Sequence, residues 1–527
     1  MATQSKTDLP PLLVRADADA VSGTGHVLRC IALAQAWSGR GGRVVFATAR
    51  PSAVLSQRIR SVGASVVALE EACPAPGDLA ATLSLCKQLQ REEDALPWIV
   101  VDGYHFDNPY QKALRQAGRL LVIDDNAHLS DYDADIVLNH GIQAPRLNYG
   151  TARDSWLLLG TRYALLRDEF APWRGAERTV PKKAQKILVT LGGGDSENVS
   201  AKAIGALQQF PSEEIVARIV VGPLHPYVAE LKRLVEHSAN IFLHTDVSEL
   251  APHMEWADIA IAGAGTTVWE LAFMQVPVLL LVLAENQSAV AQGVDEFGAA
   301  RSLGWARSVT VSALVDALRE LKDDQSKRQR MAARGRLLVD GLGVERIIGA
   351  MAERQRFVAG GDLRIRPGRH DDALLLWQWA NDPVARQNSF NSAAIAWDDH
   401  EAWFREKLAS PNCRNWILEI GDLPVGQIRY DRLDGQKAAI SFSVAPGFRG
   451  LQLGTELLAA TMDLAALELN VPWLEGVAFK DNQASRRAFL KNGFAVIDHQ
   501  FIDGQVCSIF RRARRAESTQ EYFAAFH

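Results

Sequence analysis

One histidine stands in a glycine-rich segment where it could take a proton from water. Residues 21–29 read VSGTGHVLR, and the histidine is His26, directly after Gly25. The apolar run at 11–14 predicts a strand, and apolar residues at 27, 31 and 34 predict a helix starting near His26. A strand, a glycine loop and a helix N-terminus suit an anion, and imidazole accepts protons near neutral pH. The segment predicts a general base beside a bound anion; the alternative is a structural histidine, because Gly-x-Gly alone is a weak signal.

Acidic and phenolic side chains follow two further predicted strands. Asp102 and Tyr104 follow the run 98–102, and Asp124 and Asp125 end the run 120–124. Ligands of parallel sheets bind beyond the carboxyl ends of the strands. We therefore expect these side chains to converge on the loop that carries His26. The alternative for each acid is helix capping or turn formation.

A second motif of a strand, a glycine turn and a helix lies in the second half of the chain. The strand 259–262 is followed by Gly265, Thr266 and Thr267, whose N–H and hydroxyl groups suit a diphosphate. Glu270 lies one turn into the helix and could accept hydrogen bonds from ribose hydroxyls; the alternative is a solvated helix residue. Asn286 and Gln287 follow the next strand and add amide groups beside the same site.

Strand-like runs alternate with helical stretches over most of the chain, which predicts parallel sheets. The expected strands are 12–15, 43–48, 98–102, 120–124, 136–138 and 156–159, then 186–191, 215–221, 241–244, 259–262 and 278–282. The polar stretch around 165–185 is interpreted as a linker, and a helical, charged stretch at 318–354 closes the second half. We therefore expect Rossmann-like domains at 9–172 and 183–350.

Composition limits the classes of function. A length of 527 residues predicts about three domains. A net charge of -5 does not indicate binding to nucleic acid or to a membrane. Five scattered cysteines without a CxxC pair argue against a zinc ribbon and a disulfide framework. No signal-peptide core is present, and the apolar run 276–284 is too short for a bilayer. We expect a soluble cytoplasmic protein without a metal and without nucleic-acid or membrane partners.

A third α/β domain is expected at 361–515. Helices are predicted at 371–381 and 397–409, and the strands 416–420, 425–431 and 439–444 are expected to form an antiparallel meander. The last strand runs into a glycine loop and a helix, which suits a pyrophosphate. A second strand, a polar cap and a helix follow at 477–494.

The order and spacing of the motifs over about 11–300 resemble the UDP-sugar hydrolase of pseudaminic acid biosynthesis, in the GT-B arrangement of two Rossmann-like halves. The motifs are Arg15-Ala16-Asp17, Gly23 to Arg29, Asp102 and Tyr104, Asp124-Asp125, Tyr163 to Phe170, Gly192 to Asp195, Glu270, and Asn286-Gln287. The resemblance implies hydrolysis of UDP-2,4-diacetamido-2,4,6-trideoxy-β-L-altropyranose to the free sugar and UDP, a step towards flagellin glycosylation.

The same resemblance implies roles for single residues. His26 is the base for water, Tyr104 and Asn286 lie beside the sugar, Glu270 belongs to the nucleotide site, and Asp17 is a further catalytic position. The remaining substrate or UDP contacts are Gly25, Arg29, Gly193, Gly265, Thr266, Thr267 and Gln287.

Residues 363–512 resemble the GNAT acetyltransferase superfamily, which implies acetyl-CoA as cosubstrate. The expected coenzyme contacts are Val444, Arg449, Gly450, Leu453, Gly454, Thr455, Asn482 and Ser485. Three positions depart from the usual pattern, namely Gln452, Phe489 and Ala439. The base and acid therefore stay open, with Glu475 and His400 as candidate bases and Ser485 as a candidate proton donor or helix cap. A side chain at Gln452 is expected to be tolerable only if its φ is negative and the side chain points away from the coenzyme.

Together the two resemblances imply a bifunctional enzyme. The acetyltransferase would acetylate a UDP-4-amino sugar, and the hydrolase would then cleave the product. One alternative is a UDP-sugar glycosyltransferase. Another is a nucleotide-sugar binding protein with a degenerate acetyltransferase scaffold.

Overall fold

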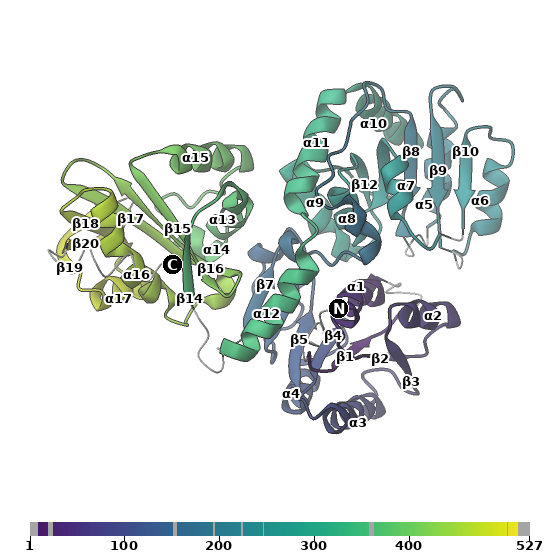
Figure 1. Cartoon of the computed structure of the whole chain (residues 1–527). Helices are drawn as coiled ribbons and strands as arrows, with labels where there is room; N and C mark the ends of the chain where they lie inside the picture. Colours follow the sequence, from purple (N-terminus) through teal and green to yellow (C-terminus); the bar gives the residue numbers. More distant parts are fainter. Residues whose placement is uncertain are drawn as a thin grey trace, which may run out of the picture. The chain divides into compact units, whose positions relative to one another are not determined.

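The computed structural model describes residues 9–18, 25–150, 155–192, 195, 197–222, 225–245, 247–357, 363–502 and 504–514. The chain divides into two compact units, the first ending at Ile348 and the second beginning at Gly349 (Figure 1). The first unit holds two parallel sheets and the second unit holds one mixed sheet. No helix of the described part is long and apolar enough to cross a membrane.

The first sheet is parallel throughout, in the order β3-β2-β1-β4-β5-β6-β7. Its strands are β1 (Leu12–Ala16), β2 (Val44–Ala49), β3 (Ser65–Leu69), β4 (Trp98–Asp102), β5 (Arg119–Ile123), β6 (Ile136–Asn139) and β7 (Trp156–Leu159). The connecting helices are α1 (Gly25–Gly39), α2 (Ala53–Ser61), α3 (Pro76–Glu93) and α4 (Asn108–Ala117). The central strands β1 and β4 are wholly buried, so the polar residues that follow them are placed by a rigid sheet edge.

The second sheet is also parallel, in the order β10-β9-β8-β11-β12-β13. Its strands are β8 (Lys186–Thr190), β9 (Val216–Val220), β10 (Ile241–His244), β11 (Ile259–Gly263), β12 (Val278–Val282) and β13 (Arg301–Trp305). Its helices are α5 (Val199–Leu207), α6 (Val228–Val235), α7 (Ala251–Trp256), α8 (Thr267–Phe273), α9 (Ser288–Phe297), α10 (Val311–Asp323) and α11 (Gln325–Leu338), and α12 (Gly343–Phe357) follows. A short 3-10 turn, η5 (Glu285–Gln287), separates β12 from α9.

Within the first unit, two strands and one connection differ from the sequence expectation. The strands β3 and β13 were not predicted; both lie at a sheet edge and are only partly buried, so their residues form no continuous apolar run. The expected linker around 165–185 does join the two sheets, but it contains the 3-10 helix η3 (Asp168–Trp173). Phe170 of that helix is 1% exposed, so this connection is packed into the unit and is not an open linker.

The sheet of the second unit has the order β14-β15-β16-β17-β18-β20-β19. Its strands are β14 (Leu363–Pro367), β15 (Cys413–Ile420), β16 (Leu423–Arg432), β17 (Lys437–Val444), β18 (Trp473–Phe479), β19 (Ala495–Ile502) and β20 (Gln505–Ala513). Its helices are α13 (Ala373–Ala380), α14 (Pro383–Gln387), α15 (Trp397–Ala409), α16 (Leu453–Glu468) and α17 (Gln483–Lys491). The antiparallel meander predicted from the sequence is confirmed for β15, β16 and β17.

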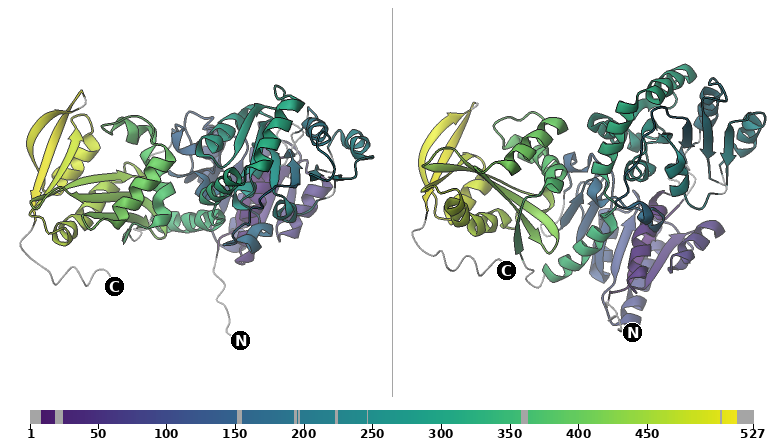
Figure 2. Two further views of the ribbon diagram at one scale, coloured as in Figure 1. Left: turned by 90° about the horizontal axis from the view of Figure 1, so that it is seen from above. Right: turned by 45° about the horizontal axis from the view of Figure 1, so that its top comes forward.

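Helices cover both faces of this sheet (Figures 1 and 2). The Tyr430 hydroxyl lies 2.9 Å from Thr461 Oγ1 on α16, whereas the guanidinium of Arg429 stacks on Trp403 of α15. Successive side chains of a strand point to opposite faces, so α15 and α16 lie on opposite faces. The strands β17 and β18 pair with each other in parallel only as far as Ile440 and Gly476, and beyond these residues β17 pairs with β16 and β18 with β20.

Candidate active sites

His26 and a buried aspartate form a hydrogen-bonded pair at the carboxyl edge of the first sheet. His26 lies in the first turn of α1, and its Nδ1 is 2.6 Å from Oδ1 of Asp102, the last residue of β4. That carboxylate is closer than Arg29 Nη2, which lies 3.2 Å from the same ring nitrogen. Nδ1–H therefore donates to Asp102, and Nε2 keeps the lone pair that a general base needs.

The Asp102 carboxylate is held in its charged form. Burial raises its pKa, but the charges of Arg29 and His26 and their hydrogen bonds outweigh burial, and the pKa is lowered overall. Arg29 donates from Nε to Asp102 Oδ2 at 2.6 Å and from Nη2 to Oδ1 at 2.6 Å. The Arg29 side chain is 3% exposed, so it organises the carboxylates behind His26; its expected contact with UDP stays a prediction.

Tyr104 and Asn286 bring the two halves of the first unit together beside His26. The Tyr104 ring lies 5.1 Å from the imidazole, edge to face, and its hydroxyl is 3.4 Å from Asp125 Oδ2. Asn286 lies in η5 of the second half, close enough to the Tyr104 hydroxyl to oppose the rise of its pKa. Burial raises the pKa of Tyr104, so the phenol keeps its proton and can donate. The convergence predicted from the strand ends holds for Asp102, Tyr104 and Asp125.

Asp124 is a turn-forming residue, as the alternative interpretation of the sequence predicted. Its carboxylate accepts from the backbone N–H groups of Asn126 at 2.8 Å and His128 at 3.2 Å, and also from the Tyr132 hydroxyl. It therefore fixes the turn after β5 and does not face His26.

Asp17 is oriented by a buried arginine. Arg15 donates to Asp17 at 2.6 and 2.7 Å, and the N–H of Ala49 donates at 2.7 Å. Arg15 also pairs with Asp78, whose carboxylate accepts from the Tyr110 hydroxyl at 2.6 Å. Burial raises the pKa of Asp17, but His105, Arg15 and the N–H of Ala49 lower it overall. Its recorded contacts join Asp17 to Arg15 and strand β2, and its catalytic role stays a prediction.

The expected nucleotide residues line the start of α8. Gln287 Oε1 accepts from the N–H of Leu283 at 3.0 Å, and a Cβ built on Gly265 would lie 3.7 Å from Gln287 Nε2. Thr266 and Thr267 follow Gly265 at the half-buried start of the helix. Gly193 lies outside the described residues.

Glu270 is not a free surface carboxylate. Its Oε1 accepts from Arg167 Nη2 at 2.8 Å, and Arg167 also pairs with Glu169 at 2.6 Å. The Glu270 side chain is 13% exposed. Arg167 comes from the connection between the two sheets, so the expected ribose site is attached to that connection.

His140, which directly follows β6, was not predicted as a site residue. Its Nε2 lies 3.4 Å from Arg29 Nη1 and 3.8 Å from Asp125 Oδ1, and its ring lies 6.2 Å from Trp269 of α8. Burial lowers the pKa of His140 to about 4, so it is neutral at pH 7. Its place after a strand of the same sheet is the signal that could have identified it.

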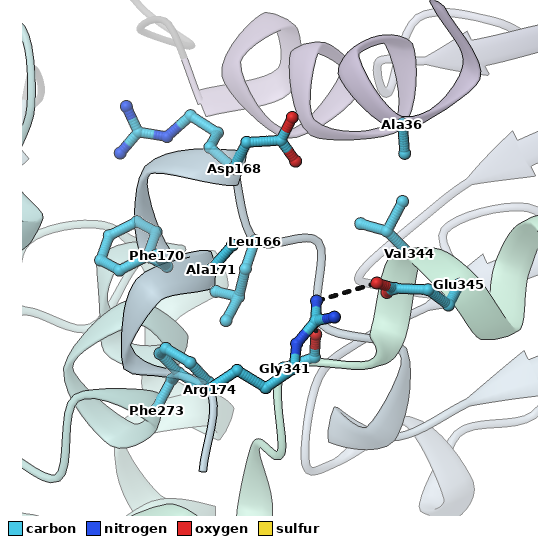
Figure 3. A pocket seen from close by; sticks show the side chains of 11 residues that line it. Ala36, Leu166, Asp168, Phe170, Ala171, Arg174, Phe273, Gly341, Val344 and Glu345 are labelled. Atoms are coloured by element: carbon cyan, nitrogen blue, oxygen red, sulfur yellow. Dashed lines mark hydrogen bonds and ion pairs between the residues drawn. The ribbon is translucent and has the colours of Figure 1, made fainter. Parts of the chain in front are cut away.

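A pocket of the first unit lies behind the connection (Figure 3). It is lined by the end of α1, by Leu166 to Arg174, by Phe273 and by Gly341 to Glu345, and Arg174 pairs with Glu345 at 2.8 Å. Arg167, which pairs with Glu270, lines it, whereas His26, Asp102 and Tyr104 do not. It is therefore separate from the site around His26.

The glycine loop of the second unit has the expected strand–loop–helix geometry, with one correction. Gly450 has a φ of 87°, and α16 begins at Leu453, so the loop leads directly into a helix N-terminus. The expected negative φ at Gln452 is wrong, because its φ is 61°. Gln452 is held in this left-handed conformation while its side chain accepts from Lys491 Nζ at 2.6 Å.

The other expected coenzyme residues lie at the end of β17, in the first turn of α16 and at the start of α17. Val444 ends β17 and Thr455 lies in the first turn of α16, where the N–H of Thr455 donates to Gln452 O. A Cβ on Gly454 would lie 3.1 Å from Phe442, so a side chain there would crowd the strand. Asn482 Oδ1 accepts from the N–H of Ser485 at 3.1 Å and caps α17.

The candidate acid and base residues of the acetyltransferase are engaged elsewhere. His400 is 3% exposed, packs against aromatic rings and lies 3.1 Å from Ala373 O; burial lowers its pKa to about 4. Glu475 pairs with Lys437 and Arg511, which lower its pKa against the effect of burial. Phe489 is 2% exposed and packs into the core. Neither His400 nor Glu475 is presented as an open base.

Comparisons with known proteins match one stretch of each unit to a family model. Residues 187–340 match the glycosyltransferase family 28 C-terminal domain, and residues 362–495 match the acetyltransferase (GNAT) domain. The chain therefore combines a hydrolase- or glycosyltransferase-like unit with a GNAT acetyltransferase domain. The predicted fold class, two Rossmann-like halves in a GT-B-like arrangement followed by a GNAT α/β domain, is confirmed.

Three relatives show the range of similarity. The spore coat polysaccharide biosynthesis protein SpsG of Bacillus subtilis is 29% identical over 189 residues, which cover 36% of this chain and 56% of that protein. An uncharacterized protein of Methanocaldococcus jannaschii is 22% identical over 487 residues, 89% of this chain and 91% of that protein. The UDP-2,4-diacetamido-2,4,6-trideoxy-beta-L-altropyranose hydrolase of Campylobacter jejuni is 22% identical over 209 residues, 39% of this chain and 74% of that enzyme.

Proposed function

We propose that the first unit hydrolyses UDP-2,4-diacetamido-2,4,6-trideoxy-β-L-altropyranose to the free sugar and UDP. The observation that carries the proposal is the His26–Asp102 pair, which faces Tyr104 and Asn286 where the two halves meet. Similarity to the named hydrolase of Campylobacter jejuni supports the substrate.

In the proposed reaction, His26 Nε2 takes a proton from water while the water oxygen attacks the anomeric carbon. The bond from that carbon to the diphosphate oxygen breaks, and UDP leaves with the electron pair. Asp102 is a positioning residue, because it fixes the imidazole and stabilises its cationic form. Tyr104 and Asn286 offer donors to the sugar, and Gly265 to Thr267 offer N–H and hydroxyl groups to the diphosphate.

The second unit is proposed to acetylate the 4-amino group of the preceding UDP-sugar. The neutral amine attacks the thioester carbonyl of acetyl-CoA, the C–S bond breaks, and CoA leaves while the amine loses a proton. The match to the GNAT domain and the loop from Arg449 to Thr455 support acetyl-CoA as cosubstrate. Because His400 and Glu475 are engaged, the base is proposed to be water at the site, and the rate should rise with pH towards a plateau.

A glycosyltransferase is the second candidate for the first unit, because residues 187–340 match a glycosyltransferase domain. The full chain should be incubated with the UDP-4-amino sugar and acetyl-CoA while CoA and UDP release are followed. The bifunctional proposal expects CoA first and then UDP without any added acceptor. UDP release that requires an added acceptor would favour the transferase, and no release of either product would favour a binding protein.

A further inference from the structure

One side-chain ion pair joins two segments of the second unit that lie far apart in the sequence. Arg449 Nη2 lies 2.5 Å from Asp382 Oδ1, across 67 residues of chain. Arg449 belongs to the loop proposed to hold the pyrophosphate of acetyl-CoA. Asp382 directly precedes α14.

The geometry favours a lasting ion pair. The Asp382 side chain is 6% exposed, and its Oδ1 also caps α14 by accepting from the N–H of Ala385 at 2.9 Å. Breaking a buried pair leaves an uncompensated charge, which is costly. The Arg449 side chain is 31% exposed and has five N–H donors, so groups remain for a phosphate.

Asp382 begins a segment that is organised by its own side chains; we call residues 382–395 the strap. Arg386 of α14 donates to Ser389 Oγ at 3.0 Å, to Asn391 O at 3.1 Å and to Ala393 O at 3.3 Å. One guanidinium therefore ties together three positions of the loop after α14.

The far end of the strap is fastened to α13. Asn381 Oδ1 accepts from the N–H of Ile395 at 2.8 Å, and Asn381 Nδ2 donates to Ile395 O at 3.1 Å. Trp377 Nε1 donates to the same carbonyl oxygen at 2.8 Å. Hydrogen bonds of single side chains therefore hold the strap at both ends and in the middle.

The strap reaches the end of β18. The ring of Phe390 lies 5.3 Å from that of Phe479, edge to face, and Phe390 is 46% exposed. Phe479 lies beyond Gly476, where the recorded pairing of β17 with β18 has ended. The exposed ring of Phe390 therefore stands beside the end of β18, beyond the part of that strand that pairs with β17.

We propose that Asp382 is a positioning residue that couples the coenzyme loop to the strap, so that acetyl-CoA and the acceptor amine bind cooperatively. The inference rests on the proposed acetyltransferase function. Acetyl-CoA contacts to the loop fix Arg449, Arg449 fixes Asp382, and the strap then presents Phe390 to the acceptor. Linkage requires the reverse effect, in which the acceptor strengthens coenzyme binding.

The test uses the full chain and the variant Asp382→Asn, since asparagine keeps the helix-capping oxygen and removes only the charge. Amide hydrogen exchange of peptides within 383–396 is measured with and without saturating acetyl-CoA. We expect acetyl-CoA to slow exchange about 10-fold in the wild type and less than about 2-fold in Asp382→Asn. Asp399→Asn, an exposed aspartate on α15, is the matched control and should behave as the wild type.

Kinetics provide an independent readout. Asp382→Asn should raise KM for both acetyl-CoA and the amino sugar about 5- to 50-fold, with a smaller change in kcat. In an Arg449→Gln background, Asp382→Asn should raise these KM values by less than a further factor of about 2, because its effect passes through Arg449. The coupling would be overturned if acetyl-CoA slowed exchange in the strap of Asp382→Asn as much as in the wild type. It would also be overturned if Asp382→Asn raised KM in the Arg449→Gln background as much as in the wild type. Either result would leave the acetyltransferase function in place. Absence of acetyl-CoA binding to the wild type would overturn both.

Discussion

Replacing Asp102 with asparagine tests whether its charge positions and supports the base. The side chain keeps its size, but the negative charge 2.6 Å from His26 Nδ1 is lost. Two unit charges with centres about 4 Å apart interact by about 4 kcal/mol at an effective dielectric constant near 20. Arg29 neutralises part of this field, so we expect about 2–4 kcal/mol less stabilisation of the imidazolium. That loss lowers kcat about 30- to 1000-fold.

The assay is steady-state release of UDP from the UDP-diacetamido sugar, together with the affinity for UDP and the melting temperature. Arg29 keeps its contact with Asp125, so the variant should fold and bind UDP as the wild type does. Asp316→Asn, at a carboxylate that is 75% exposed, controls for a lost surface charge and should leave kcat unchanged. A folded Asp102→Asn variant with kcat within about 3-fold of the wild type would refute the positioning role.

Three further outcomes follow from single contacts. Glu270→Ala should raise KM more than it lowers kcat, because it removes ground-state binding and the partner of Arg167; an unchanged KM would place the nucleotide elsewhere. The pKa of His140 falls from 6.5 in the unfolded chain to about 4 in the fold, so the unfolded chain binds a proton first as the pH falls. The free energy of unfolding is therefore unaffected by this residue above pH 6.5 and decreases by about 3 kcal/mol as the pH falls to 4. Denaturant titrations of the wild type and His140→Asn at pH 7 and pH 5 should show a smaller acid loss in the variant, and equal losses would contradict burial as the cause. Gln452→Gly should relieve the left-handed φ and stabilise the second unit by up to about 1 kcal/mol while acetyl-CoA still binds; a clear loss of stability in thermal melts would show that the contact with Lys491 outweighs the strain.

The buried parallel strands could be predicted from the sequence because they are continuous apolar runs. Strand β4 is such a run, and it ends at Asp102, so the edge that carries the candidate site was predictable as well. The edge strands β3 and β13 were not predicted, because each is half exposed and mixes polar with apolar residues. Edge strands need less apolar surface than central ones.

The ion pairs of the candidate sites could not be predicted, because sequence spacing does not determine long-range contacts. Arg167 and Glu270 are 103 residues apart, and Asp382 and Arg449 are 67 apart. The backbone of Gln452 shows a second limit: glycine is the usual residue at a positive φ, so a glutamine suggested the opposite conformation.

The most direct test of the central claim is the variant His26→Asn, assayed for UDP binding and for hydrolysis of the UDP-diacetamido sugar. The amide cannot act as a base, whereas the expected nucleotide contacts at Gly265 to Glu270 lie in the other half of the first unit. We predict unchanged UDP affinity and a turnover at least ~100-fold lower than that of the wild type. Turnover near the wild-type value, with UDP still bound, would contradict the role of His26 as the base.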